Sequence, residues 1–186
     1  TAAKLQGKRT IDARGLVAAP GFIDLHSHAG NFETARYQAK DGVTTRLELE
    51  LGTYPVDRWY AARQGQALIN YGTSVGHTAI RYFLQKGGGA AGLAALKDPD
   101  AMFSAPEISQ TIPDAAYARL TPLLEEGLRQ GAIGVGSGTQ YSPGITRREM
   151  LDVTRVAGKA HSCVFTHIRY GSLVEPGSTL EAVQEN

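Results

Sequence analysis

The sequence lacks most features that mark a specialised class of protein. Cys163 is the single cysteine among 186 residues, which excludes an internal disulfide and a cysteine-rich zinc module. Lys and Arg number 19 against 18 Asp and Glu, so the net charge gives no reason to expect a nucleic-acid or membrane-surface partner. No apolar run approaches the ~18 residues of a transmembrane helix. The first ten residues, TAAKLQGKRT, lack the apolar region of a signal peptide, so we expect a cytoplasmic protein.

What the sequence does contain is typical of a globular domain. Hydrophobic residues make up 42% and charged residues 20% of the chain, which excludes a disordered, collagen-like or coiled-coil protein. Its 22 glycines indicate many tight turns between short elements. Length alone predicts one domain, because a domain typically holds ~100–200 residues.

Segments typical of strands alternate with segments typical of helices. The turn pair Pro20-Gly21 precedes an apolar run that predicts a buried strand, and further strands are predicted at 42–51, 72–80, 132–137 and 163–168. This alternation indicates βα units and a parallel sheet. Both an open doubly wound sheet and a (β/α)₈ barrel fit the pattern, although a full barrel needs ~250 residues.

Helices are predicted at 57–70 with Asp57 as the N-cap, at 114–130, and from Thr146 to about Lys159. Pro122 should either kink the second helix or begin its second half. Thr146 and Glu149 form a capping box at the start of the third.

A second capping box, Ser178-Thr179-Leu180-Glu181, begins a helix in which the chain ends after fewer than three turns. Natural domains rarely end inside a capped amphipathic helix. We therefore expect the chain to be one part of a longer protein.

The strongest chemical motif is Asp24-Leu25-His26-Ser27-His28. Residues two apart on a strand face the same side, so His26 and His28 would direct two imidazoles toward one point. The carboxyl end of a parallel strand is also where active-site residues lie in α/β folds. The alternative for an isolated HxH motif is a pair of solvated histidines in a turn.

Further candidate ligands lie on, or at the ends of, the other predicted strands. Glu48 and Glu50 share one face of an apolar strand, where carboxylates are costly unless they are paired, hydrated or bound to a metal; the alternative is a solvated edge strand. His77 and His167 end two more strands, and each alone would be an ordinary hydrogen-bonded histidine. Four of the five histidines in the chain nevertheless occupy strand ends, and imidazole with carboxylate suits zinc or a similar divalent ion.

Several segments together resemble a known family. IDARGLVAAPGFIDLHSH resembles the start of the barrel in the amidohydrolase superfamily. In order and spacing, DGVTT, YGTSVGHTAIR, LLEEGLRQGAIGVGSGTQYSPG and THIR resemble its N-acyl-D-amino-acid deacylase (D-aminoacylase-like) branch. The resemblance runs from about Thr10 to the end of the chain.

The resemblance implies a fold. It implies a (β/α)₈ TIM barrel of the metal-dependent hydrolase type, of which this chain supplies about the first five βα units. Residues 1–18 would be a remnant of an N-terminal β-sandwich with the strand that leads into the barrel. Residues 19–186 would be the N-terminal portion of an incomplete barrel.

The resemblance also implies a ligand set for one or two divalent ions, most commonly zinc. His26 and His28 correspond to ligands of the more buried ion and His167 to a ligand of the other. Glu50, with Glu48 as the fallback, stands where typical D-aminoacylases have a bridging cysteine. Tyr141 corresponds to a tyrosine lining the substrate pocket.

The implied activity is hydrolysis of the amide C–N bond of an N-acyl amino acid, or of a related small amide, by attack of metal-bound hydroxide. His77 is a second candidate substrate-binding residue, as a hydrogen-bond donor in the pocket. The family's catalytic aspartate would lie beyond residue 186, so we predict no catalytic residue in this chain and no activity for it in isolation.

A deaminase, a dihydroorotase-like cyclic-amide hydrolase and a non-catalytic scaffold barrel remain alternatives. The expected partner is a small-molecule substrate, without nucleic acid or membrane, and a homo-oligomer is compatible with the sequence.

Overall fold

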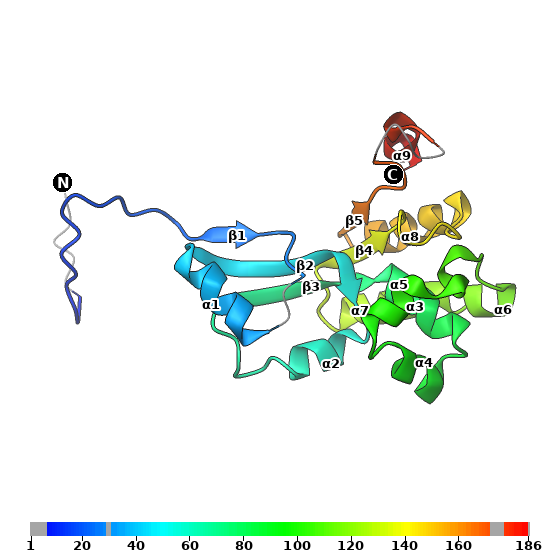
Figure 1. The fold of residues 1–186 in the computed structure, drawn as a ribbon, viewed down its shortest axis with the longest axis horizontal. Helices are drawn as coiled ribbons and strands as arrows, with labels where there is room; N and C mark the ends of the chain where they lie inside the picture. The colour runs from blue at the N-terminus through cyan, green and yellow to red at the C-terminus, as the bar shows by residue number, and fades with distance from the viewer. Residues whose placement is uncertain (1–6, 29–30, 172–176, 186) are drawn as a thin grey trace.

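The fold is built on one parallel sheet (Figure 1). The computed structural model describes residues 7–28, 31–171 and 177–185. The five strands are β1 (Phe22–Asp24), β2 (Val43–Thr53), β3 (Asn70–Gly76), β4 (Gly134–Gly138) and β5 (Cys163–His167). They lie in the order β1-β2-β3-β4-β5, and every neighbouring pair is parallel.

This strand order decides between the two architectures that the sequence leaves open. In a doubly wound sheet the order reverses after the first strands, so that later strands add on the opposite side of β1. Here each strand lies beside its predecessor along the chain, which is the order of a βα barrel. The carboxyl ends of all five strands therefore lie along one edge.

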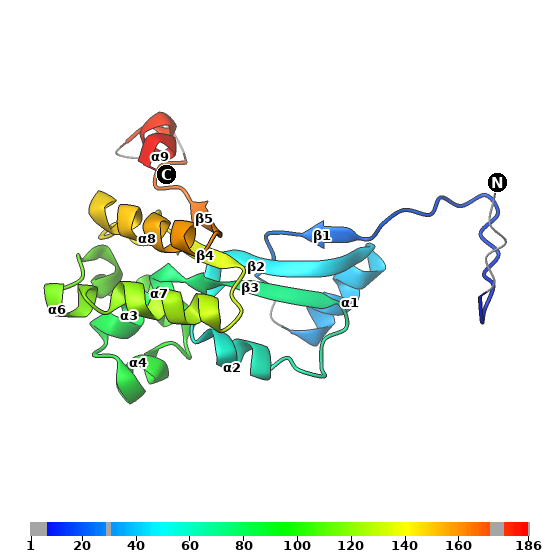
Figure 2. The same cartoon turned by 180° about the vertical axis from the view of Figure 1, so that it is seen from behind.

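Helices follow the strands as in βα units (Figure 2). They are α1 (Phe32–Lys40), α2 (Val56–Ala61), α3 (His77–Gln85), α4 (Gly89–Ala95), α5 (Pro99–Ser104), the 3₁₀ helix η1 (Pro106–Ser109), α6 (Asp114–Tyr117), α7 (Leu120–Arg129), α8 (Arg147–Lys159) and α9 (Thr179–Glu185). α7 packs against β3 and α3, and α8 packs against β5 and α7. Within the described ranges, no helix has the length and apolarity needed to cross a membrane.

The apolar core lies between the sheet and these helices. Val75 and Val135 from the strands are completely buried against Ile80, Leu124 and Val153 from α3, α7 and α8. Burying each such side chain stabilises the fold by about 1.5–3 kcal/mol. This core fixes the helices on one face of the sheet, and with them the carboxyl ends of β2 to β5.

Several elements agree with the sequence. α8 begins after Thr146, whose Oγ1 accepts a hydrogen bond from the Glu149 backbone N–H at 3.1 Å. Ser178 and Glu181 make the reciprocal capping bonds before α9. Gly131 has φ of 101° just past α7, as a helix-ending glycine should.

Other elements differ. β1 forms where predicted, but Phe22 and Ile23 are 68% and 60% exposed rather than buried, because within the described residues β1 pairs only with β2. The helix predicted at 57–70 is only Val56–Ala61, with Asp57 inside its first turn, and Gly65 adopts φ of 73°, which breaks a helix.

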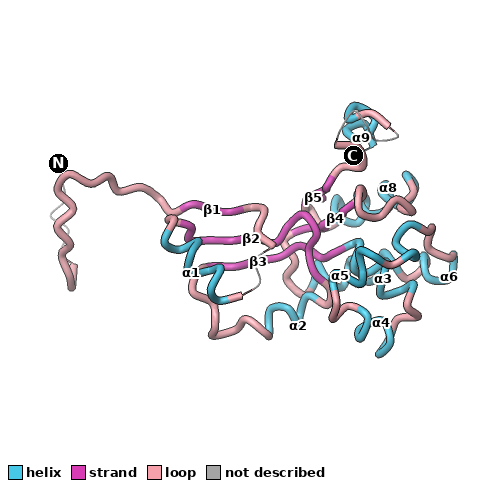
Figure 3. Tube along the Cα trace, in the orientation of Figure 1, coloured by secondary structure: helices cyan, strands magenta, loops and turns pink. Residues whose placement is uncertain are grey.

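The strand predicted at 72–80 spans Asn70–Gly76, because His77 already begins α3. The helix predicted at 114–130 is two helices, and Pro122 is the third residue of α7, where its missing N–H would have no intrahelical partner. Residues 7–21 contain no helix or strand and extend away from the sheet (Figure 3). The assignment of residues 1–18 to a sandwich remnant therefore stays a prediction.

Candidate metal centre

Three predicted ligands converge at the carboxyl edge of the sheet. His26 and His28 follow β1, and Glu50 lies on β2. The two histidine Nε2 atoms are 2.9 Å apart, and they lie 3.5 Å and 3.2 Å from Glu50 Oε2. The ligand atoms of all three side chains fit within 4.8 Å of one another, a spacing that one ion can span.

Glu50 is the centre of this cluster. It is 7% exposed, and His167 Nδ1 at the end of β5 lies 2.9 Å from its Oε1. Nevertheless, among the described residues neither carboxylate oxygen has a hydrogen-bond partner. A buried ionised carboxylate without partners is costly, whereas a divalent cation held by His26, His28 and Glu50 would satisfy the carboxylate and the two imidazole nitrogens. The residues present therefore fit a metal ion.

Glu48 occupies a different position. Both of its oxygens accept from His28 Nδ1 at 3.0 Å. With the proton on Nδ1, the Nε2 lone pair of His28 is free to face the cluster, which is the carboxylate–histidine arrangement common behind metal ligands. Burial raises the pKa of Glu48, and the attraction of His28 only partly offsets this. Of the two glutamates, Glu50 is the one that the structure brings into the cluster.

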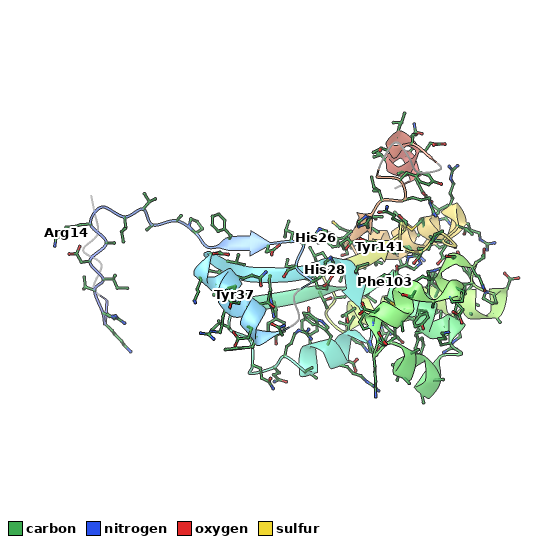
Figure 4. All side chains as sticks on the ribbon, in the orientation of Figure 1. Arg14, His26, His28, Tyr37, Phe103 and Tyr141 are labelled. Carbon is green, nitrogen blue, oxygen red and sulfur yellow. The ribbon has the colours of Figure 1, made fainter. Side chains whose placement is uncertain are left out.

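Tyr141 lies against His167. Its hydroxyl is 2.9 Å from His167 Nδ1, and the two ring centroids are 4.5 Å apart. The tyrosine is 39% exposed, and its ring also contacts Phe103 at 5.4 Å. Burial raises the pKa of Tyr141, and the charge of Glu50 raises it further. Figure 4 shows His26, His28, Tyr141 and Phe103 in the same region of the molecule.

His77 is not brought to this cluster. It has no exposed surface, Nε2 lies 2.7 Å from Glu149 Oε1, and Nδ1 lies 2.9 Å from Ser137 Oγ. Because a carboxylate only accepts, Nε2 donates to Glu149 and Nδ1 accepts from Ser137. Arg81 Nη1 lies 2.6 Å from both oxygens of Glu149. Burial lowers the pKa of His77, which keeps it neutral, so Arg81 is the cation that balances Glu149.

Sequence reasoning missed this buried network and the position of Phe103. The sequence indicates only a capping role for Glu149, whereas in the structure its carboxylate contacts His77, which lies 72 positions earlier in the chain. One usable signal was present, since His77 and Arg81 are four residues apart and so share one face of a helix. No local pattern marks Phe103 as a neighbour of Tyr141.

The chain is similar in sequence to proteins of known activity. Residues 9–78 match the sequence model of a family described as "Amidohydrolase family". A D-aminoacylase of Alcaligenes xylosoxydans xylosoxydans is 29% identical over 86% of this chain and 35% of its own length. An N-acyl-D-aspartate deacylase of the same organism is 29% identical over 88% of this chain and 35% of its own length.

Solved structures show the same fold. The crystal structure of an N-acyl-D-glutamate deacylase from Bordetella bronchiseptica, complexed with zinc and a phosphonate inhibitor, matches with a TM-score of 0.67 and 24% identity over 89% of this chain and 36% of that one. The chain thus spans about a third of the length of the relatives it matches. It resembles N-acyl-D-amino-acid deacylases in sequence, and its five-stranded parallel sheet matches part of their TIM barrel.

Proposed function

We propose that the protein is a metal-dependent hydrolase that cleaves the amide bond of an N-acyl amino acid. The observation that carries the proposal is the buried Glu50 carboxylate, which has three imidazole nitrogens around it and, within residues 7–28, 31–171 and 177–185, no hydrogen-bond partner. The similarity to D-aminoacylase and N-acyl-D-aspartate deacylase supports the choice of an N-acyl amino acid as substrate.

In this proposal His26, His28, Glu50 and His167 hold the metal. When bound, a divalent ion supplies Lewis-acid chemistry, polarising an amide carbonyl and activating water at neutral pH. Glu48 keeps the proton on Nδ1 of His28 and fixes the orientation of the ring.

Tyr141 is proposed to donate a hydrogen bond to the substrate carbonyl oxygen. Its hydroxyl lies beside His167 and the side chain is partly exposed, so a substrate bound at the cluster could reach it. His77 is assigned no contact with the substrate, because it is completely buried and both of its ring nitrogens are occupied.

The test uses the full-length protein, loaded with zinc and freed of excess ion. Metal content is measured by mass spectrometry, and release of free amino acid is measured with D and L forms of several N-acyl amino acids. Wild type should bind zinc and turn over at least one substrate, whereas Glu50→Gln should lose bound zinc. Glu33→Gln is the matched control, because Glu33 is exposed on α1 and pairs only with Arg36. A folded wild type that binds no divalent ion, or that binds zinc and releases no amino acid, would overturn the proposal.

A further inference from the structure

A cavity of about 350 Å³ lies beside the candidate metal centre. Its polar end is formed by His28 and Glu48. The remaining wall comes from the end of β2, the start of α3 and the α4–α5 segment, and its apolar lining includes Leu51, Ala79, Leu96, Pro99, Met102 and Phe103. The volume lies in the range of ~300–1,000 Å³ that small-molecule sites occupy.

The α4–α5 wall of this cavity is anchored to α3. Met102 is 9% exposed and packs with Tyr82 and Ile108 in a small core of its own. Behind that core, Gln85 Nε2 donates to the Glu107 backbone carbonyl at 2.7 Å. The wall is therefore a packed part of the fold, and the cavity is formed before any ligand enters.

The charges around the cavity limit what can enter it. None of the described residues that line it is Lys or Arg, and the Glu48 carboxylate lies at its polar end. The amino-acid half of an N-acyl amino acid carries a carboxylate, which would be costly to bury among these apolar side chains without a cation. The acyl half carries no charge and gains free energy when apolar surface is buried.

We propose that this cavity binds the acyl chain, and that the substrates are amino acids with an extended apolar acyl group rather than a short acetyl group. The inference rests on the proposed amide hydrolase activity, because only that activity places an acyl chain beside His28 and Glu48. The substrate is thereby oriented with its amide at the candidate metal centre and its amino-acid half directed away from the cavity.

The first test compares kcat/KM of the zinc-loaded full-length protein for acetyl, butanoyl and hexanoyl derivatives of one amino acid. Burial of each added methylene should raise kcat/KM by about fourfold until the cavity is full. Ala79→Leu puts three more carbons into the cavity and should lower the hexanoyl-to-acetyl ratio at least about tenfold. Ala94→Leu is the matched control, because Ala94 is exposed on α4 and does not line the cavity; its ratio should equal that of wild type.

A second variant covers the case in which Ala79→Leu does not fold. Phe103→Ala removes apolar wall and should also lower the hexanoyl-to-acetyl ratio. The inference would be overturned if kcat/KM of wild type did not depend on acyl length. It would equally be overturned if the hexanoyl-to-acetyl ratio of kcat/KM were unchanged in both variants. It would also be overturned if the variants instead discriminate between N-acetyl amino acids by the size of the amino-acid side chain.

Calorimetric binding of octanamide separates this inference from the proposed function, because octanamide carries no carboxylate and requires no turnover. Binding that is weakened by Ala79→Leu, together with no hydrolysis of any N-acyl amino acid, would support the apolar cavity and overturn the hydrolase. Hydrolysis without octanamide binding and without dependence on acyl length would support the hydrolase and overturn the acyl cavity.

Discussion

Replacing Glu149 with glutamine should destabilise the protein far more than the loss of a surface charge. Glu149 on α8 is completely buried, as are His77 and Arg81, which contact its carboxylate at 2.7 Å and 2.6 Å. Arg81 also donates from Nη2 to the Gln110 backbone carbonyl at 2.7 Å. Because glutamine has nearly the same shape but no charge, the variant leaves a buried guanidinium without a counter-ion.

The expected magnitude follows from the burial. Breaking a buried ion pair by removing the charge of one partner costs about 3–5 kcal/mol. Glu126→Gln is the control, because Glu126 pairs with Arg129 on an exposed turn of α7, and such pairs contribute about 0.2–1 kcal/mol. Urea denaturation of the full-length protein at pH 7 gives the free energy of unfolding for wild type and both variants.

The pH dependence gives a second, independent readout of the same change. Burial raises the pKa of Glu149, but hydrogen bonds from His77 and Arg81 and the positive charge of Arg81 outweigh it and leave this pKa below its usual value. Its stabilising contribution is therefore fully present above the unfolded pKa of ~4.3 and is lost as pH falls through the folded pKa. The stability difference between wild type and Glu149→Gln should narrow below about pH 4. A difference under about 1 kcal/mol at pH 7, or one that does not change with pH, would refute the ion-pair argument.

Three further predictions concern His77, Glu48 and two glycines. Burial lowers the pKa of His77, so the free energy of unfolding should fall as pH decreases below ~6.5. His77→Gln should remove this pH-dependent loss when unfolding is followed in urea. A pH profile of stability that is the same in wild type and variant would contradict this prediction. Glu48→Gln should weaken zinc binding about 10–100-fold in chelator competition, because in the proposed metal site Glu48 fixes the ring of His28; unchanged zinc affinity would count against that role. Gly136→Ala should cost about 1–3 kcal/mol, since a Cβ would lie 2.5 Å from the Leu49 carbonyl oxygen. At Gly158 an added Cβ would meet no described atom within 4 Å beyond its chain neighbours and the local helix backbone, so Gly158→Ala should stabilise α8 by about 1 kcal/mol. Equal effects of the two changes in urea denaturation would refute this steric argument.

The parts of the fold predicted from sequence are those specified by local signals. Thr146 with Glu149 and Ser178 with Glu181 begin helices at the expected residues. The run of β-branched and alternating residues at 42–51 becomes β2. In each case a few neighbouring residues contain the whole signal, so no tertiary information is needed.

The parts that were missed depend on residues far apart in the chain. The β-branched residues Thr78 and Ile80 suggested a strand, but they lie in α3. That helix buries His77 and Arg81 against Glu149 on α8. Secondary-structure propensities depend on neighbouring residues and therefore cannot predict this contact. α1 was also missed, although Asn31 caps it by accepting from the Thr34 N–H at 2.8 Å, because its sequence FETARYQAK shows little apolar periodicity.

The same distinction explains why the sequence placed four histidines alike at strand ends, whereas the structure divides them between two sites. Both His–Glu assemblies place imidazoles against a buried carboxylate. At Glu149 that carboxylate has a hydrogen bond from His77 and hydrogen bonds and the charge of Arg81, so it is satisfied without an ion. At Glu50 three imidazole nitrogens lie within 3.5 Å, but no hydrogen bond from the described part of the chain reaches either oxygen. The presence of Arg81 beside Glu149, rather than the residue types, therefore separates that structural network from the candidate metal site.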